Sequence, residues 1–139
     1  MSAMRGAAAY SRGAGAYAKV GVESGVMSAS PHQLIVMLFD GALSSIRAAK
    51  LHLNDGNVQA KGKAISKALD IVNNGLLAAL DAERGGEVAE RLASLYDYIA
   101  RLLLTANLHN DEKSLDEATR LLEDIGSAWR EIGSQANGV

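Results

Sequence analysis

The chain has 139 residues, a formal net charge of −2 at pH 7 and no cysteine, so it is long enough for one domain with a real hydrophobic core. The missing cysteines exclude disulfides, thiol nucleophiles and cysteine-based zinc sites, and the small charge gives no electrostatic reason to expect nucleic acid as a partner. No stretch approaches the ~20 apolar residues of a membrane span or has the pattern of a signal peptide, so we expect a cytoplasmic protein without membrane insertion.

Residues 1–27 are rich in glycine and alanine and are a poor helix former. We expect a flexible N-terminal arm here, and two interpretations remain open. The arm is either a frayed terminus or a segment that lies down on the rest of the protein through its larger side chains. The arm residues that we expect to make such contacts are Tyr17, Val20 and Val26.

The first helix is expected over residues 31–54. Ser30 can cap it, Pro31 suits the first helical position, and Gln33 can reach back to complete a capping box. The apolar run that follows covers more of the helix surface than one core stripe needs. Val36 and Met37 lie outside that stripe, so we expect them to be covered by another part of the chain or by a partner.

The second helix is expected over residues 58–82, after a cluster of capping residues at 54–57. It carries a core stripe at helical period and, beside it, a strip of mostly small side chains. Small residues on a flank allow another helix to approach closely. The strip therefore indicates either tight packing within the chain or a shallow groove for a partner.

Glycines at 85 and 86 separate this helix from a third one, expected over residues 87–108, which also has a second apolar flank. The short connection makes the second and third helices antiparallel neighbours. We infer a partner-binding groove along their second flanks, formed by Ala64, Ala68, Ile71, Gly75, Ala78, Ala93, Tyr96, Ala100 and Leu104.

A fourth helix is expected over residues 112–132, with Asp111 as its cap and a single apolar stripe. Residues 133–139 are expected to be a disordered tail. Residues 28–132 together predict an all-α fold, an antiparallel up-down-up-down four-helix bundle.

The sequence lacks the patterns of an enzyme site. No Glu-x-x-His pair supports a di-metal site, and the three histidines are scattered. Lys61, Lys63 and Lys67 are expected to form a solvated basic face. We therefore expect no catalytic residue, no cofactor and no metal.

Several stretches carry a resemblance to a known family. These are the run A-Y-A-K-V-G-V-E-S-G-V-M-S-A-S-P-H-Q-L-I-V-M-L-F-D-G-A-L at 16–43, K-G-K-A-I-S-K-A at 61–68, G-L at 75–76, L-Y-D-Y-I-A-R-L at 95–102, A-N at 106–107 with Asp111, and A-W-R-E-I at 128–132. They resemble the flagellar secretion chaperone FliS and cover nearly the whole chain in order.

The resemblance implies a cytoplasmic helical bundle without enzymatic activity. Such chaperones bind the disordered C-terminal segment of flagellin, prevent its premature polymerisation and deliver it to the flagellar export gate of the type III export apparatus. Tyr17 matches the tyrosine of the family's N-terminal arm. The alternative is a structural or regulatory bundle that self-associates through the same surface, and a homodimer stays open in either case.

Overall fold

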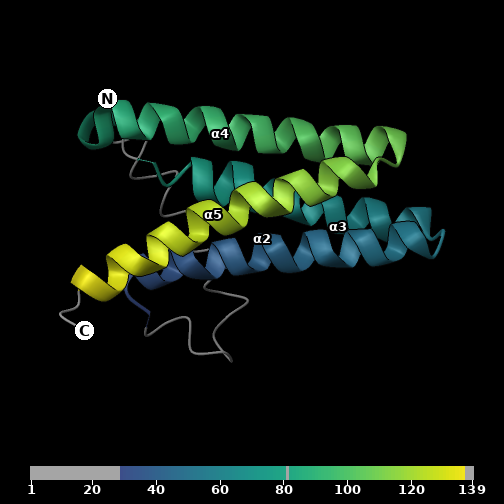
Figure 1. Cartoon of the computed structure of the whole chain (residues 1–139), viewed down its shortest axis with the longest axis horizontal. Coiled ribbons are helices and arrows are strands. Elements are labelled where there is room, and N and C mark those ends of the chain that lie inside the picture. The colour runs from purple at the N-terminus through teal and green to yellow at the C-terminus, as the bar shows by residue number, and fades with distance from the viewer. Residues whose placement is uncertain (1–28, 81, 137–139) are drawn as a thin grey trace.

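The protein is a bundle of four antiparallel helical rods in which the described residues contain no strand (Figure 1). The computed structural model describes residues 29–80 and 82–136. The expected arm, with Tyr17, Val20 and Val26, lies outside these residues. The all-α up-down-up-down fold is confirmed by the element order, which is α2 (Pro31–Asn54), α3 (Val58–Asp70) continuing as η3 (Ile71–Leu77), α4 (Ala82–His109) and α5 (Glu112–Ala136).

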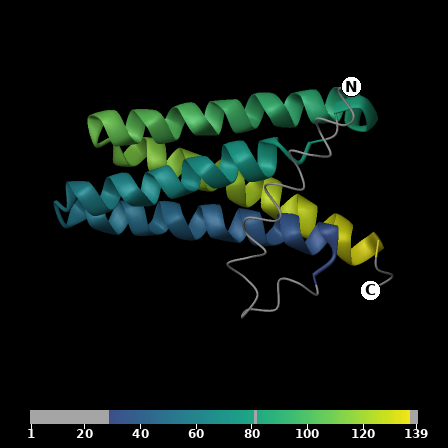
Figure 2. The same ribbon diagram turned by 180° about the vertical axis from the view of Figure 1, so that it is seen from behind.

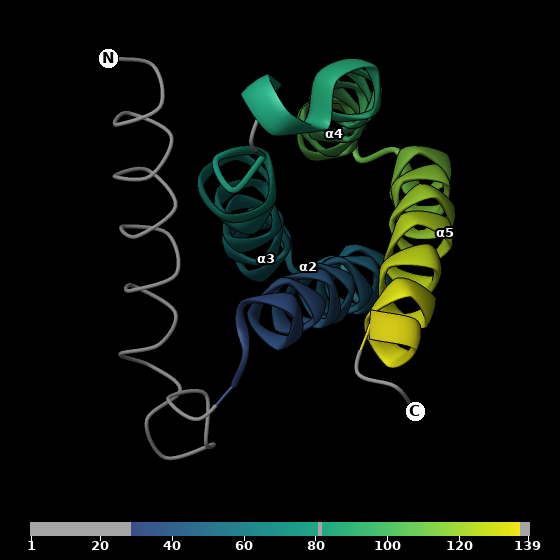
Figure 3. The ribbon, with the colours of Figure 1, turned by 90° about the vertical axis from the view of Figure 1, so that its left-hand side faces the viewer.

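Viewed along its axis, the bundle has α2 and α4 at opposite corners, with α3 on one side and α5 on the other (Figure 3). α3 and η3 run between α2 and α4, as the view from behind shows (Figure 2). α5 crosses obliquely from the end of α4 to the beginning of α2 (Figure 1). Each rod therefore has two neighbours, and a single core lies between all four.

The first helix has the bounds that its capping pattern indicates. The Ser30 side chain accepts from the Gln33 backbone N–H at 3.1 Å, and the Gln33 side chain accepts from the Ser30 N–H at 2.8 Å. At the other end Gly56 has φ 75°, and the Asn57 N–H donates to the His52 carbonyl at 2.9 Å. This closes the helix with the left-handed turn for which glycine is suited.

The second rod differs from the continuous α-helix that we expected over 58–82. α3 ends at Asp70, and the chain continues as a seven-residue π-helix, η3, through Leu77. No helix follows over residues 78–80. The apolar spacing of this rod fits an α-helix throughout, so periodicity alone gave no sign of the wider turn.

The other two rods are longer than expected. α4 begins at Ala82, although Gly86, with φ 54° and ψ −127°, interrupts it and only the part after Gly86 is regular. α5 continues to Ala136, so the expected disordered tail is wrong for residues 133–136, which are helical. Residues 137–139 lie outside the described part of the chain.

The core is built from aliphatic side chains of all four rods around one phenylalanine. The largest fully buried side chains are Phe39, Ile46, Ile65, Ile71, Val72, Leu76, Ile99, Leu103, Leu115 and Leu122.

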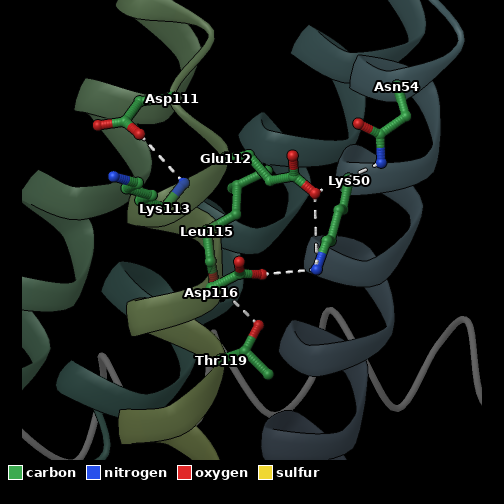
Figure 4. Close-up of polar contacts among 8 residues, drawn as sticks. All are labelled: Lys50, Asn54, Asp111, Glu112, Lys113, Leu115, Asp116 and Thr119. Atoms are coloured by element: carbon green, nitrogen blue, oxygen red, sulfur yellow. Dashed lines mark hydrogen bonds and ion pairs between the residues drawn. The ribbon is translucent and has the colours of Figure 1, made fainter.

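Polar contacts attach α5 to α2 (Figure 4). Lys50 Nζ lies 2.7 Å from Asp116 Oδ1 and 3.7 Å from Glu112 Oε1. Further along, Arg130 pairs with Asp40. These pairs are more than one-third exposed, so they fix the position of α5 more than they stabilise the fold.

Lys61 is buried, and the expectation that it belongs to a solvated basic face is wrong. Only 2% of the residue is exposed, and its Nζ donates to the Asn107 carbonyl at 2.9 Å and to Asn110 Oδ1 at 2.6 Å. Asn110 has φ 55°, and the Asp111 N–H donates to the Ala106 carbonyl at 3.2 Å. Lys61 thus satisfies the Asn107 carbonyl, which the C-terminal turn of α4 leaves free, and the side-chain oxygen of Asn110.

Candidate binding site

An apolar pocket of about 460 Å³ opens at the end of the bundle where α2 begins. Every rod contributes to it, because the start of α2, the end of η3, the middle of α4 and the second half of α5 meet there. Its lining residues are Pro31, His32, Ile35, Leu76, Ala79, Leu80, Leu92, Tyr96, Ile125 and Trp129. The size and the apolar lining are those of sites that take up apolar groups of a ligand.

Two aromatic rings form one edge of this pocket. The rings of His32 and Trp129 stack with centroids 4.8 Å apart and an interplanar angle of 11°. The Trp129 indole N–H donates to the His32 carbonyl at 3.2 Å. His32 Nε2 is buried and has no hydrogen-bond partner among the described residues. The edge is therefore fixed by one hydrogen bond and a ring stack, while the pocket surface itself stays apolar.

Tyr96 contributes to the pocket from inside the bundle, with 3% of its surface exposed. Its ring lies 6.4 Å from that of Phe39, centroid to centroid, at an angle of 53°. Burial raises the pKa of its phenol to about 12, because a buried phenolate loses hydration. The phenol is therefore neutral at physiological pH.

The η3 wall of the pocket packs closely on α2. A Cβ atom on Gly75 would lie 3.1 Å from both δ-carbons of Leu38, and one on Gly41 would lie 3.3 Å from Ile71 Cδ1. Each glycine thus receives a large side chain of the other segment. This reciprocal contact explains why position 75, which looked like part of a groove, lies inside the bundle.

The predicted groove residues are distributed between the core and the surface. Leu104 is exposed, with an exposed fraction of 55%, and the neighbouring Leu108 reaches 77%. Ala64, Ala78 and Ala93 are partly buried. The remaining predicted residues are buried, and they are Ala68, Ile71, Gly75, Tyr96 and Ala100.

Only Tyr96 among the predicted groove residues lines the pocket. The groove along α3 and α4 stays a prediction. Trp129 lines the pocket but was not among the predicted groove residues. Its residue type was a signal in the sequence, because a tryptophan at the edge of a groove is often an interaction hot spot.

The surplus apolar surface of α2 is partly exposed. Met37 has an exposed fraction of 40%, and Val36 is half-buried. The arm residues Tyr17, Val20 and Val26 lie outside the described residues, so the expected cover of Val36 and Met37 by another part of the chain or by a partner stays a prediction.

A second, smaller depression of about 300 Å³ lies between α2 and α5. The exposed ion pair between Asp40 and Arg130 crosses it, and Glu123 adds a further carboxylate. Gly126 of α5 packs against Phe39 at its base, where an added Cβ would lie 3.3 Å from Phe39 Cγ. Polar and apolar groups contribute about equally to its lining. Asp40, the charged residue that ends the apolar run of α2, lies here and is paired with Arg130.

The described residues show neither a metal site nor a membrane span. No group of three or more His, Cys, Asp or Glu side chains within residues 29–80 and 82–136 is placed to hold a metal ion. No described helix combines the length and the hydropathy that crossing a bilayer requires.

A sequence profile of the family described as "Flagellar protein FliS" matches residues 13–136. The chain belongs to the FliS family. The "Flagellar secretion chaperone FliS" of Salmonella typhimurium (strain LT2) is 57% identical over 122 residues, which cover 88% of this chain and 90% of that protein. The protein of the same name from Escherichia coli (strain K12) is 48% identical over 120 residues, covering 86% and 88%. In Bacillus subtilis (strain 168) the match is 28% over 109 residues, covering 78% and 80%.

Membership in the FliS family of flagellar secretion chaperones implies a non-enzymatic role. It also implies partners related to flagellar export in general. The pocket is consistent with such a role, since it offers an apolar surface.

Proposed function

We propose that this chain is a cytoplasmic export chaperone that binds the disordered C-terminal segment of flagellin, prevents its premature polymerisation and delivers it to the flagellar type III export apparatus. The observation that carries the proposal is the open apolar pocket in a member of the FliS family. A protein that handles unfolded clients needs apolar surface that its own core leaves uncovered.

Recognition through an amphipathic helix suits this surface. A disordered segment that folds on binding lays its apolar face into a groove and leaves its polar face in water. The ordering of the segment costs free energy, which limits the affinity and permits later release at the export gate. The pocket would take the large side chains of the segment.

The exposed leucines of α4 offer a second apolar surface, toward the end of α4 that lies away from the pocket. Leu104 and Leu108 lie one turn apart on the solvent side of α4, where they have no cover among the described residues. We include Leu104 in the client-binding surface, together with the partly buried alanines Ala64, Ala78 and Ala93. The buried members of the predicted groove would support the surface from below.

Isothermal titration with a synthetic peptide of the flagellin C-terminal segment tests the proposal. We expect binding with a dissociation constant of about 10 μM or tighter, which corresponds to roughly 7 kcal/mol. Absence of binding at tens of micromolar (roughly 6 kcal/mol or weaker) would contradict it.

Variants locate the binding surface. Leu80→Glu places a charge in the pocket and Leu104→Glu places one on α4, so each should weaken binding by about tenfold or more. Leu51→Glu is the matched control, because Leu51 is also an exposed leucine but lies near the other end of α2. Equal effects of all three variants would show that charge alone, and not a particular surface, governs the affinity.

Light scattering distinguishes the alternative. A bundle that self-associates through this surface would increase in mass as the protein concentration rises. Only a peptide from its own chain would reduce that mass. A chaperone that uses the surface for its client forms a complex with the peptide whose mass is the sum of the two chains.

A further inference from the structure

The first turn of α2 packs against two residues of α5 that lie one helical turn apart, Trp129 and Gly133. The His32 ring stacks on the Trp129 indole, and an edge of the same ring faces the backbone of Gly133. A Cβ atom on Gly133 would lie 2.7 Å from His32 Cε1 and closer still to Nε2 and Cδ2. Because carbon atoms in contact are about 3.5 to 4.0 Å apart, any side chain at position 133 would overlap the histidine ring.

A contact of the same kind occurs two turns earlier on α5. Gly126 lies seven residues before Gly133, and Phe39 lies seven residues after His32. An added Cβ atom on Gly126 would lie 3.3 Å from Phe39 Cγ. Seven residues are about two turns of an α-helix, so both glycines lie on one face of α5 and both rings on one face of α2. Each glycine thus makes room for one ring of the antiparallel neighbour.

The two contacts differ in what surrounds them. Phe39 is a core residue with 1% of its surface exposed. His32 is only partly buried, and it lines the apolar pocket together with Trp129. The contact at Gly126 therefore serves the fold, whereas the contact at Gly133 lies at the edge of the candidate binding site.

His32 holds Trp129 at two points, through the ring stack and through its carbonyl, which accepts from the indole N–H at 3.2 Å. The backbone of His32 is itself fixed, because the residue follows Ser30 and Pro31 in the capped first turn of α2. Its ring atom Nε2 is buried and has no hydrogen-bond partner among the described residues. The stack and the fit against Gly133 therefore hold this edge of the ring.

We propose that Gly133 is a positioning residue of the apolar pocket. By leaving room for the His32 ring, it lets this ring stack on Trp129 and hold the indole in the wall of the pocket. There the indole meets a large apolar side chain of the client segment. A side chain at position 133 displaces the ring and, with it, the indole. The identity of the client rests on the proposed function, whereas the placement of Trp129 does not.

Three variants and one control test this role. Gly133→Ala adds a methyl group that meets the His32 ring. Alanine has a higher helix propensity than glycine, so a loss comes from this contact and not from α5 itself. His32→Ala removes the ring, and the double variant combines the two changes. Gly126→Ala is the matched control, because it makes the same change on the same helix against a ring of the core.

Isothermal titration with the flagellin C-terminal peptide measures the affinity of each folded variant. Gly133→Ala and His32→Ala should each bind at least about tenfold more weakly than the unaltered chain. The double variant should bind about as weakly as His32→Ala, because the added methyl group no longer meets a ring. Independent roles would instead multiply two tenfold losses to about a hundredfold.

The control separates this role from a general loss of stability. Gly126→Ala should melt at a lower temperature, since its methyl group crowds Phe39, but should bind within about twofold of the unaltered chain. Any one of three results would overturn the proposal: unchanged affinity in Gly133→Ala, multiplied losses in the double variant, or an equal loss in Gly126→Ala.

The indole N–H separates a failure of this proposal from a failure of the proposed function. Trp129 is the chain's single tryptophan, so it gives one indole N–H signal in an NMR spectrum. If no peptide binds the unaltered chain, the proposed function fails, and the placement of Trp129 is judged on the free proteins. The indole proton should exchange with water at least about tenfold faster in Gly133→Ala and His32→Ala, and at an unchanged rate in Gly126→Ala. Equal rates in Gly133→Ala and the unaltered chain would overturn the proposal.

The unaltered chain and His32→Ala carry the test if Gly133→Ala does not fold. Nuclear Overhauser effects should then join the His32 ring protons to the α-protons of Gly133 and to the Trp129 indole. These contacts, together with faster indole exchange in His32→Ala, support the proposal. Their absence, or an unchanged exchange rate in His32→Ala, would overturn it.

Discussion

The indole N–H of Trp129 donates a hydrogen bond to the backbone carbonyl of His32, and the two rings stack with centroids 4.8 Å apart. The contact joins residues 97 positions apart in the sequence, near the C-terminal end of α5 and in the first turn of α2. It closes the bundle at the end that carries the pocket. The same tryptophan therefore serves the fold and the candidate binding site.

Trp129→Phe should keep an aromatic ring against His32 and remove the hydrogen bond. The expected loss is about 1 kcal/mol in the free energy of unfolding, the usual worth of one such bond. Trp129→Ala should cost more, because it also removes the stacked ring and leaves a larger cavity. Urea unfolding followed by circular dichroism measures both. Equal stability of the phenylalanine variant and the unaltered chain would show that the bond contributes nothing.

Lys61→Met should destabilise the protein by about 1 to 3 kcal/mol, because the carbonyl of Asn107 and the side chain of Asn110 lose their donor inside the structure. Lys63→Met is the matched control, since Lys63 is exposed on the same helix. We expect a change of no more than about 0.5 kcal/mol there. Thermal melts of the two variants decide the matter, and equal melting temperatures would contradict the structural role of Lys61.

Gly75→Ala and Gly62→Ala should have opposite signs. A Cβ at position 75 would lie 3.1 Å from both δ-carbons of the buried Leu38, so overpacking should cost about 1 to 3 kcal/mol. At position 62 the nearest atom, Asn107 Oδ1, is 3.8 Å away, and the better helix propensity of alanine should stabilise by about 0.5 to 1 kcal/mol. Chemical denaturation of both variants measures the difference. A stabilising alanine at 75 would mean that η3 and α2 are not closely packed.

Tyr96→Phe should change how stability depends on alkaline pH. The pKa of the folded-state phenol is about 12, raised by burial from the model-peptide value of 10.0. The unfolded chain therefore loses this proton first, and the stability that is full below about pH 10 falls as the pH rises toward 12. The unaltered chain should lose roughly 1 to 3 kcal/mol more than Tyr96→Phe over this range.

Urea titrations at several pH values between 8 and 12 measure this difference. Lys50 and Tyr98, whose pKa values are also raised, are present in both proteins, so their effects cancel in the comparison. Parallel stability curves for the two proteins would show that Tyr96 ionises as easily in the folded state as in the unfolded chain.

The fold could be predicted from the sequence because its signals are local. The capping box at Ser30 and Gln33 fixed the start of α2, and the apolar stripes fixed the number of rods. The π turn could not be predicted, since Leu69, Val72, Leu76 and Leu80 keep an α-helical spacing through it. The close packing of Gly75 of this segment on Leu38 is a contact between two rods, which the pattern of one helix does not contain.

The candidate site was harder to predict for the same reason. The pocket brings together residues of all four rods, and no single helix pattern contains it. The predicted groove used the flank of each helix in isolation, yet burial of that flank depends on which rod lies next to it. Lys61 was misjudged likewise, because its partners Asn107 and Asn110 are distant in sequence.

The start of α2 and the last turns of α5 lie at the same end of the bundle, joined by His32 and Trp129. A fluorescent label or fusion partner attached at the start of α2 or in the last turns of α5 would therefore lie at the pocket end of the bundle and would compete for space with a ligand. The turn at Gly56 lies at the opposite end, is exposed and has open space around it. Exposed turns of this kind tolerate insertions, so Gly56 is the position at which the protein can be tagged while its pocket stays accessible.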